Sequence, residues 1–282
     1  MKRLVFPSVV AVCLVAVLSV SLASTRTVMS QEKPKPIQLF NGKDLTNFYT
    51  WLVDQHYEDP DKVFTVVDAI DGAPAIRVSG QRLGAFITKE EFSNYHLVTE
   101  WRWGPATWGG RKERTKDSGI LVHCQGPDGS QAKDFNGAWM TSVESQIIEG
   151  GVGDFILVSG FDKDGNAVKP KLTVTAGKDR DGEAIYDPKA EAKEFTGGRI
   201  NWFARDVDWA DRLGFRGRDD IESSDGQWTR QEVICDGDKI TTIVNGKVAN
   251  VGTKSSLTRG KIIFQSELAE IYFRKVELTP LR

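Results

Sequence analysis

The chain has 282 residues, of which 40% are hydrophobic and 27% are charged, and its formal net charge at pH 7 is −2. Such a balance offers no strongly basic face, so nucleic acid is not an expected partner. The length is long for an average domain but suits one β-sandwich behind a short leader.

The first 23 residues are predicted to be a signal peptide. Lys2 and Arg3 precede an almost wholly apolar run from Leu4 to Ala23, which ends in the small residues that a signal peptidase prefers. The alternative is a retained anchor helix, because the run approaches the minimum length of a membrane span. The cleavage pattern favours export, so we expect a periplasmic or secreted protein with no membrane contact after cleavage. Residues 24–36 are polar and proline-rich and are interpreted as a linker.

From residue 37 onward, short apolar or alternating segments are separated by glycine, proline, asparagine and aspartate. Examples are KVFTVVD, YHLVTEWRW and SGILVHC, and turn dipeptides occur at Asp236-Gly237 and Asn245-Gly246. No long segment has a helical period. This pattern predicts an all-β sandwich or barrel formed by residues 37–282 as one domain. Residues 155–225, rich in charge and glycine, are interpreted as long loops inserted between strands.

Cysteine and histidine usage limits the chemistry. Cys124 and Cys235 lie in apolar, strand-like segments, and they either pair after export or remain buried free thiols. The three histidines show no paired metal-ligand spacing, so no zinc site is expected. No cofactor is predicted, a divalent metal is left open, and the oligomeric state is not indicated.

The segment SVESQIIEGGVGD, residues 142–154, carries the first candidate site. If it is a strand, Val143 and Ile147 face the core, while Glu144 and Gln146 face the opposite side. Glu149 falls at the strand end, where the following glycines permit a bulge that would turn it toward the same cleft. Two carboxylates in different environments can divide acid and base roles. The alternative is an exposed edge strand with solvated glutamates.

Other candidates come from neighbouring segments. In SGILVHC, simple alternation places His123 opposite the core, as a proton-transfer group, although a hydrogen-bonded structural histidine is equally consistent. Trp139 and Trp202 lie in irregular polar segments and are candidates for stacking on a ligand. Arg102 is either an ion partner in the cleft or a solvated side chain.

Five motifs resemble, in order, those of the 3-keto-disaccharide hydrolase family, whose members are also described as 3-keto-glucoside lyases and hydratases. They are IQLFNGKDLTNF, DSGILVHC, VESQIIEGG, GQWTRQEVICDGDKITTIVNGKVA and GKIIFQSELAEIYFRKVELTPL, which together extend from residue 37 to residue 281. The resemblance implies a concanavalin A-like, two-sheet antiparallel jelly roll. It also implies cleavage or hydration of 3-keto-glycosides through proton abstraction beside the ketone, with net hydrolysis by elimination and hydration.

Individual residues match the family's motifs. Glu144 and Gln146 match its E-x-Q, Glu149 stands where aspartate is usual, and His123 stands at or near an arginine. Gln265 is followed by Ser266 and Glu267 where members often have a histidine at the third position, so that histidine is missing here.

These observations assign provisional roles for a carbohydrate substrate. Glu144 is expected to be the general base or a substrate anchor, and His123 and Glu149 are expected to supply acid or orient water. Substrate contacts are expected from the side chains of Gln146, Gln265, Glu267, Arg102, Trp139 and Trp202. The competing hypotheses are a non-catalytic lectin-like module, since one fold serves both uses, and a structural envelope protein.

Overall fold

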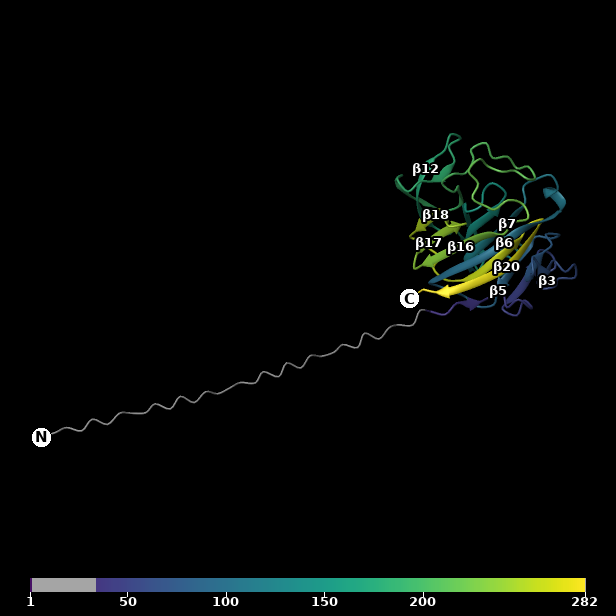
Figure 1. Ribbon diagram of the computed structural model, residues 1–282, viewed down its shortest axis with the longest axis horizontal. Coiled ribbons are helices and arrows are strands. Elements are labelled where there is room, and N and C mark those ends of the chain that lie inside the picture. The colour runs from purple at the N-terminus through teal and green to yellow at the C-terminus, as the bar shows by residue number, and fades with distance from the viewer. Residues whose placement is uncertain (2–33, 282) are drawn as a thin grey trace. The chain divides into compact units, whose positions relative to one another are not determined.

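The computed structural model describes Met1 and residues 34–281, which are coloured in Figure 1. The predicted signal peptide and most of the predicted linker lie outside the described residues. Within the described part of the chain, no helix is long and apolar enough to cross a membrane.

A seven-stranded antiparallel sheet forms one layer of the fold. In its centre, the strand that contains Ile120 pairs on one side with the strand of Ser145 and on the other with the strand of Phe264. Segments distant in sequence therefore lie side by side. In spatial order its strands are β15 (Gly198–Ile200), β9 (Phe155–Val158), β8 (Thr141–Ile148), β7 (Asp117–Gln125), β19 (Lys261–Ser266), β5 (Gly84–Thr88) and β2 (Phe48–Leu52).

An eleven-stranded antiparallel sheet forms the other layer. Its main path is β13 (Ala184–Tyr186), β12 (Leu172–Lys178), β18 (Lys247–Thr253), β17 (Lys239–Val244), β16 (Thr229–Asp236), β6 (Tyr95–Thr107), β20 (Ala269–Pro280), β4 (Ala73–Val78) and β3 (Phe64–Ile70). In addition, β1 (Ile37–Gln38) pairs with β20, and β14 (Ala192–Phe195) pairs with β12. A separate hairpin joins β10 (Gly160–Phe161) to β11 (Ala167–Val168), and a 3₁₀ turn, η1, spans Gly109–Arg111. The predicted two-sheet antiparallel jelly roll is confirmed.

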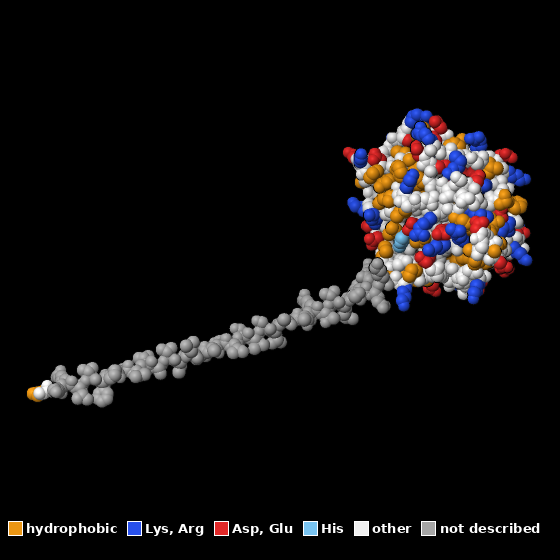
Figure 2. Space-filling view, viewed as in Figure 1, with side chains coloured by type: hydrophobic (Ala, Val, Ile, Leu, Met, Phe, Trp, Pro, Cys, Tyr) orange, Lys and Arg blue, Asp and Glu red, His pale blue; other side chains and the backbone are white. Residues whose placement is uncertain are grey.

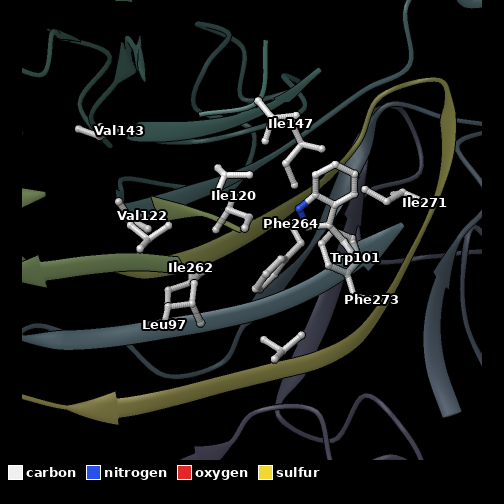
Figure 3. Packing of buried hydrophobic residues seen from close by; sticks show 14 of the residues in the cluster. Leu97, Trp101, Ile120, Val122, Val143, Ile147, Ile262, Phe264, Ile271 and Phe273 are labelled. Carbon is white, nitrogen blue, oxygen red and sulfur yellow. The ribbon is translucent and has the colours of Figure 1, made fainter. Parts of the chain in front are cut away.

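The core lies between the two sheets and is built by alternating side chains (Figure 3). Phe264 of β19 stacks on Phe86 of β5 at 4.6 Å and meets Phe273 of β20 edge-on at 5.4 Å. Trp101 of β6 is also fully buried in this layer. Aromatic pairs in these geometries add to the free energy gained by burying their apolar surface.

Residues 155–225 do not consist of loops alone. They contain seven short strands, from β9 to β15, and the long stretch between β15 and β16 contains none. The interpretation of this region as inserted loops was therefore wrong for its first part. Exposure explains β13 and β14, which contain no buried residue and so lack the hydrophobic alternation by which a strand is recognised. In β12, by contrast, buried and partly exposed residues alternate regularly, and the sequence interpretation overlooked this pattern.

Cys124 and Cys235 are both buried and unpaired in the part of the chain that the structure describes. Burial raises the pKa of each thiol, to about 12 for Cys235. Of the two alternatives drawn from the sequence, the structure shows the free thiols. Basic and acidic side chains are interspersed over the face seen in Figure 2, in agreement with the nearly balanced charge.

Candidate active site

Strand β8 presents different chemistry on its two faces. Val143 and Ile147 pack in the core, and the Ser145 hydroxyl lies 2.8 Å from the Thr242 hydroxyl of the opposite sheet. Glu144 and Gln146 therefore lie on the outer face of the seven-stranded sheet, as the alternation predicts. The strand places one carboxylate and one amide where a ligand can reach them.

The outer face is hollowed by a cavity of about 490 Å³, here called the carboxylate pocket. Three acidic side chains and two arginines meet there, and they come from β7, β8, β15, the residue after β19 and the 3₁₀ turn η1. The lining residues include Arg111, Asp117, Gln131, Trp139, Glu144, Gln146, Ile156, Arg199, Gln265 and Glu267.

Glu144 and Gln265 lie directly over Gly119 of β7. A Cβ atom at position 119 would collide with the side-chain oxygens of both residues, so the site requires glycine there. Glu144 Oε1 and both polar atoms of the Gln265 amide are buried and have no hydrogen-bond partner among the described residues. Buried polar groups are nearly always paired, so these atoms are suited to receive a polar ligand.

Burial and mutual repulsion perturb the acidic groups of the pocket. The pKa of Glu144 is raised well above its usual value by burial, and then by the nearby Glu267 and Asp117. Burial and Glu267 likewise raise the pKa of Asp117, against the opposing effect of Arg111. Burial raises the pKa of Glu267 as well. Carboxyl groups in this condition hold protons at higher pH than exposed ones and are typical of acid–base sites.

Two arginines supply positive charge at the pocket. Arg111 pairs with Asp117 and lies 3.1 Å from Glu267, so one guanidinium bridges both carboxyl groups. Arg199 is held by Asp154, Nη1 to Oδ2, at 2.8 Å. Fixed guanidinium groups of this kind can stabilise negative charge that develops on a substrate oxygen. Among residues 34–281, no group of three or more histidine, cysteine or acidic side chains is arranged to hold a metal ion.

His123 does not reach this pocket. A register shift in β7 lies between Val122 and Gln125, and His123 has a φ of +54°. Its Nδ1 is 2.9 Å from the Leu257 carbonyl oxygen, and its ring packs edge-on against Tyr95 of the core. The expected alternation was wrong here because the bulge exchanges the faces of His123 and Cys124. Burial lowers the pKa of His123 to about 4.

Glu149 is also absent from the pocket lining. Its carboxylate accepts hydrogen bonds from the backbone N–H of Lys116 at 3.0 Å and of Gly214 at 2.8 Å. Its carbonyl oxygen accepts the Nε1–H of Trp209 at 2.8 Å. The glycines after β8 therefore turn Glu149 toward the segment that follows β15, which it anchors.

The remaining predicted residues divide between the pocket and other places. Gln146, Gln265, Glu267 and Trp139 line the pocket. Arg102 lies on the eleven-stranded sheet, donates to Asp71 at 2.8 Å and is not in this cleft. Trp202 is 1% exposed and belongs to the core, which contradicts the expectation of a stacking surface.

Sequence reasoning missed Arg111, Arg199 and Gln131, and it did not select Asp117 as a site residue. Asp117 is the first residue of DSGILVHC, one of the five resembling motifs, and this was the available signal. Arg111 lies in the 3₁₀ turn η1 and Arg199 in the short edge strand β15, and only the folded chain brings them to the same cavity.

Comparisons with known proteins agree with this architecture. The profile of the 3-keto-alpha-glucoside-1,2-lyase-like domain, which defines the 3-keto-disaccharide hydrolase family, matches residues 35–279. The chain belongs to this family, and membership indicates a carbohydrate-related function. A search of curated proteins found no match.

Several solved structures are similar to the chain at low identity. Two crystal structures described as glycosyl hydrolases from Parabacteroides distasonis share 18% and 17% identity, with TM-scores of 0.46 and 0.48. Each covers 88% of this chain, and the chain covers 100% and 94% of them. The carbohydrate-binding module CBM66 from Bacillus subtilis shares 11% identity with a TM-score of 0.42, over 82% of this chain and 95% of that one.

Proposed function

We propose that the chain is an enzyme that cleaves or hydrates 3-keto-glycosides in the carboxylate pocket. The observation that carries this proposal is the buried Glu144 carboxylate, which has an unpartnered oxygen beside two further acidic groups and two arginines. Family membership supplies the substrate class. Export to the periplasm or the exterior, expected from the leader, is part of the same proposal.

Glu144 acts as the general base in this scheme. A ketone at C3 acidifies the proton on C2 of the sugar, and the ionised Glu144 removes that proton. The electron pair left on carbon forms an enolate, whose oxygen is stabilised by a guanidinium of Arg111 or Arg199. A base with a raised pKa is a stronger proton acceptor near neutral pH than an ordinary carboxylate.

The Asp117–Glu267 pair supplies the acid. The enolate collapses to a C1–C2 double bond, the C1–O bond breaks, and the leaving oxygen takes a proton from this pair. Addition of water across the double bond, with OH on C1 and H on C2, then completes net hydrolysis. Asp117 and Glu267 thus replace His123 and Glu149, which lie outside the pocket.

The alternative of a non-catalytic lectin-like module is less well supported. A lectin-like module would carry exposed tryptophans along a groove. Of the two tryptophans proposed for stacking, only Trp139 lines the pocket. A structural envelope protein would have this face filled by its own loops, whereas a cavity of about 490 Å³ is present.

The proposed function is tested by incubating the purified protein with 3-keto-α-glucosides and measuring the aglycone that is released from the sugar. We expect turnover by the wild type, with no release from the corresponding glucosides that lack the ketone. If the folded wild-type protein releases nothing from 3-keto-glycosides, the catalytic proposal is wrong.

A further inference from the structure

A second cavity lies at the β15 edge of the seven-stranded sheet. It has a volume of about 260 Å³ and is here called the Arg–Trp pocket, lined by Asp181, Glu183, Arg199, Arg205, Asp206, Val207 and Trp209. Arg199 of the edge strand β15 lines both this cavity and the carboxylate pocket. The two cavities are therefore neighbours that share one side-chain wall.

Ion pairs hold the side chains in place where the two cavities meet. Asp154 is fully buried and pairs with both Arg199 and Arg205, so one carboxylate fixes two guanidinium groups. Arg205 in turn lies over the Trp209 ring, with Cζ 4.6 Å from the ring centroid. Trp209 Nε1 donates to the Glu149 carbonyl oxygen at 2.8 Å. This network holds the aromatic ring and the shared guanidinium in place before any ligand arrives.

The lining of the Arg–Trp pocket suits a polyhydroxylated ring. Three acidic side chains and two arginines line it, so both acceptors and donors are available to hydroxyl groups. Trp209 is half-buried and lines the cavity, and the aromatic surface that Arg205 leaves uncovered suits the C–H face of a pyranose. The mixed charge does not favour an anion or a cation.

We propose that the Arg–Trp pocket binds the second sugar ring of a disaccharide substrate whose 3-keto ring occupies the carboxylate pocket. This assignment rests on the proposed function for the identity of the first ring. Arg199 then lies near the glycosidic linkage, in contact with both rings. The segment after β15, which Glu149 anchors, becomes a determinant of leaving-group specificity.

Equilibrium binding tests the proposal independently of turnover. In a Glu144→Gln background, calorimetry compares 3-keto-trehalose, with two rings, and methyl 3-keto-α-glucopyranoside, with one. We expect the disaccharide to bind roughly tenfold more tightly, the gain of one well-packed ring. Val207→Trp, which fills the pocket from a half-buried position, should remove this difference.

Val248→Trp, at an exposed valine on β18, is the matched control and should preserve the difference. If Val207→Trp does not fold, Glu183→Ala takes its place, because position 183 is exposed. This variant should weaken disaccharide binding roughly threefold. Equal affinities for the two sugars, absence of binding by both, or a difference that survives both Val207→Trp and Glu183→Ala would overturn the proposal. A binding preference without aglycone release by the wild type would instead refute only the catalytic function.

Discussion

Gly119 and Glu144 lie on neighbouring strands so closely that any side chain at position 119 would occupy the place of the Glu144 carboxylate. The backbone of Gly119 does not need a positive φ, so its requirement for glycine comes from the close approach alone. A residue without a side chain on β7 thus makes room for the proposed base on β8.

Gly119→Ala is therefore expected to displace the Glu144 and Gln265 side chains with only a modest loss of stability. Misplacement of a catalytic group by about 1 Å can cost on the order of a hundredfold in rate, and we expect a fall in kcat of at least tenfold. Gly177→Ala on β12, where an added Cβ meets nothing within 4 Å, is the control. Steady-state kinetics and thermal unfolding of both variants check this, and an unchanged kcat in Gly119→Ala would argue against the role of Glu144.

The guanidinium of Arg111 bridges the two carboxyl groups that we assign as the acid. Arg111→Met removes the cation that lowers the pKa of Asp117 and Glu267, so both pKa values should rise further. In the pH profile of kcat, the limb that reflects the titration of this pair should move to higher pH. The value of kcat should fall about tenfold to a hundredfold. Arg111→Lys should restore part of the rate. A pH profile that does not move in Arg111→Met contradicts the assignment.

Stability against pH should report on the buried Glu222. Burial outweighs the nearby Arg216 and raises the pKa of this carboxyl from 4.5 to about 8. Because the folded state holds the proton more tightly, its contribution to stability is full below pH 4.5 and is lost as the pH rises through about 8. Glu222→Gln should therefore flatten the decline of the free energy of unfolding between pH 5 and pH 8, by about 1–3 kcal/mol.

Denaturant unfolding of Glu222→Gln at both pH values measures this effect, with Glu194→Gln at an exposed position as the control. An identical decline in the wild type and Glu222→Gln would show that another group is responsible.

Much of the fold could be predicted from local sequence patterns, whereas the set of residues that meet in the carboxylate pocket could not. The alternation around Glu144 and Gln146 predicted the face on which they lie, because the pairing of β8 is regular through these residues. His123 was misplaced because a bulge adds a residue without leaving a trace in the hydrophobic pattern. Arg111 and Arg199 lie 88 positions apart and join one pocket only through tertiary packing, which no local pattern contains.

The structure assigns His123 a structural role instead of the expected catalytic one, and a substitution at this position tests that assignment. His123→Asn keeps a residue that tolerates a positive φ, and it should reduce stability while leaving kcat within about threefold of the wild type. Comparison of kcat at a fixed concentration of folded protein checks this. A loss of kcat near that of Glu144→Gln, without unfolding, would return His123 to the catalytic site.

The central claim is that Glu144 removes the proton on C2 of a 3-keto-glycoside. Its most direct test is proton NMR of a 3-keto-α-glucoside in D₂O with wild-type protein and with Glu144→Gln, using Glu149→Gln as a folded control. The account predicts that the wild type and Glu149→Gln lose the C2 proton signal, by elimination or by exchange for deuterium. Glu144→Gln should be slower by about a hundredfold or more. Loss of the C2 proton at the wild-type rate in Glu144→Gln would contradict the claim.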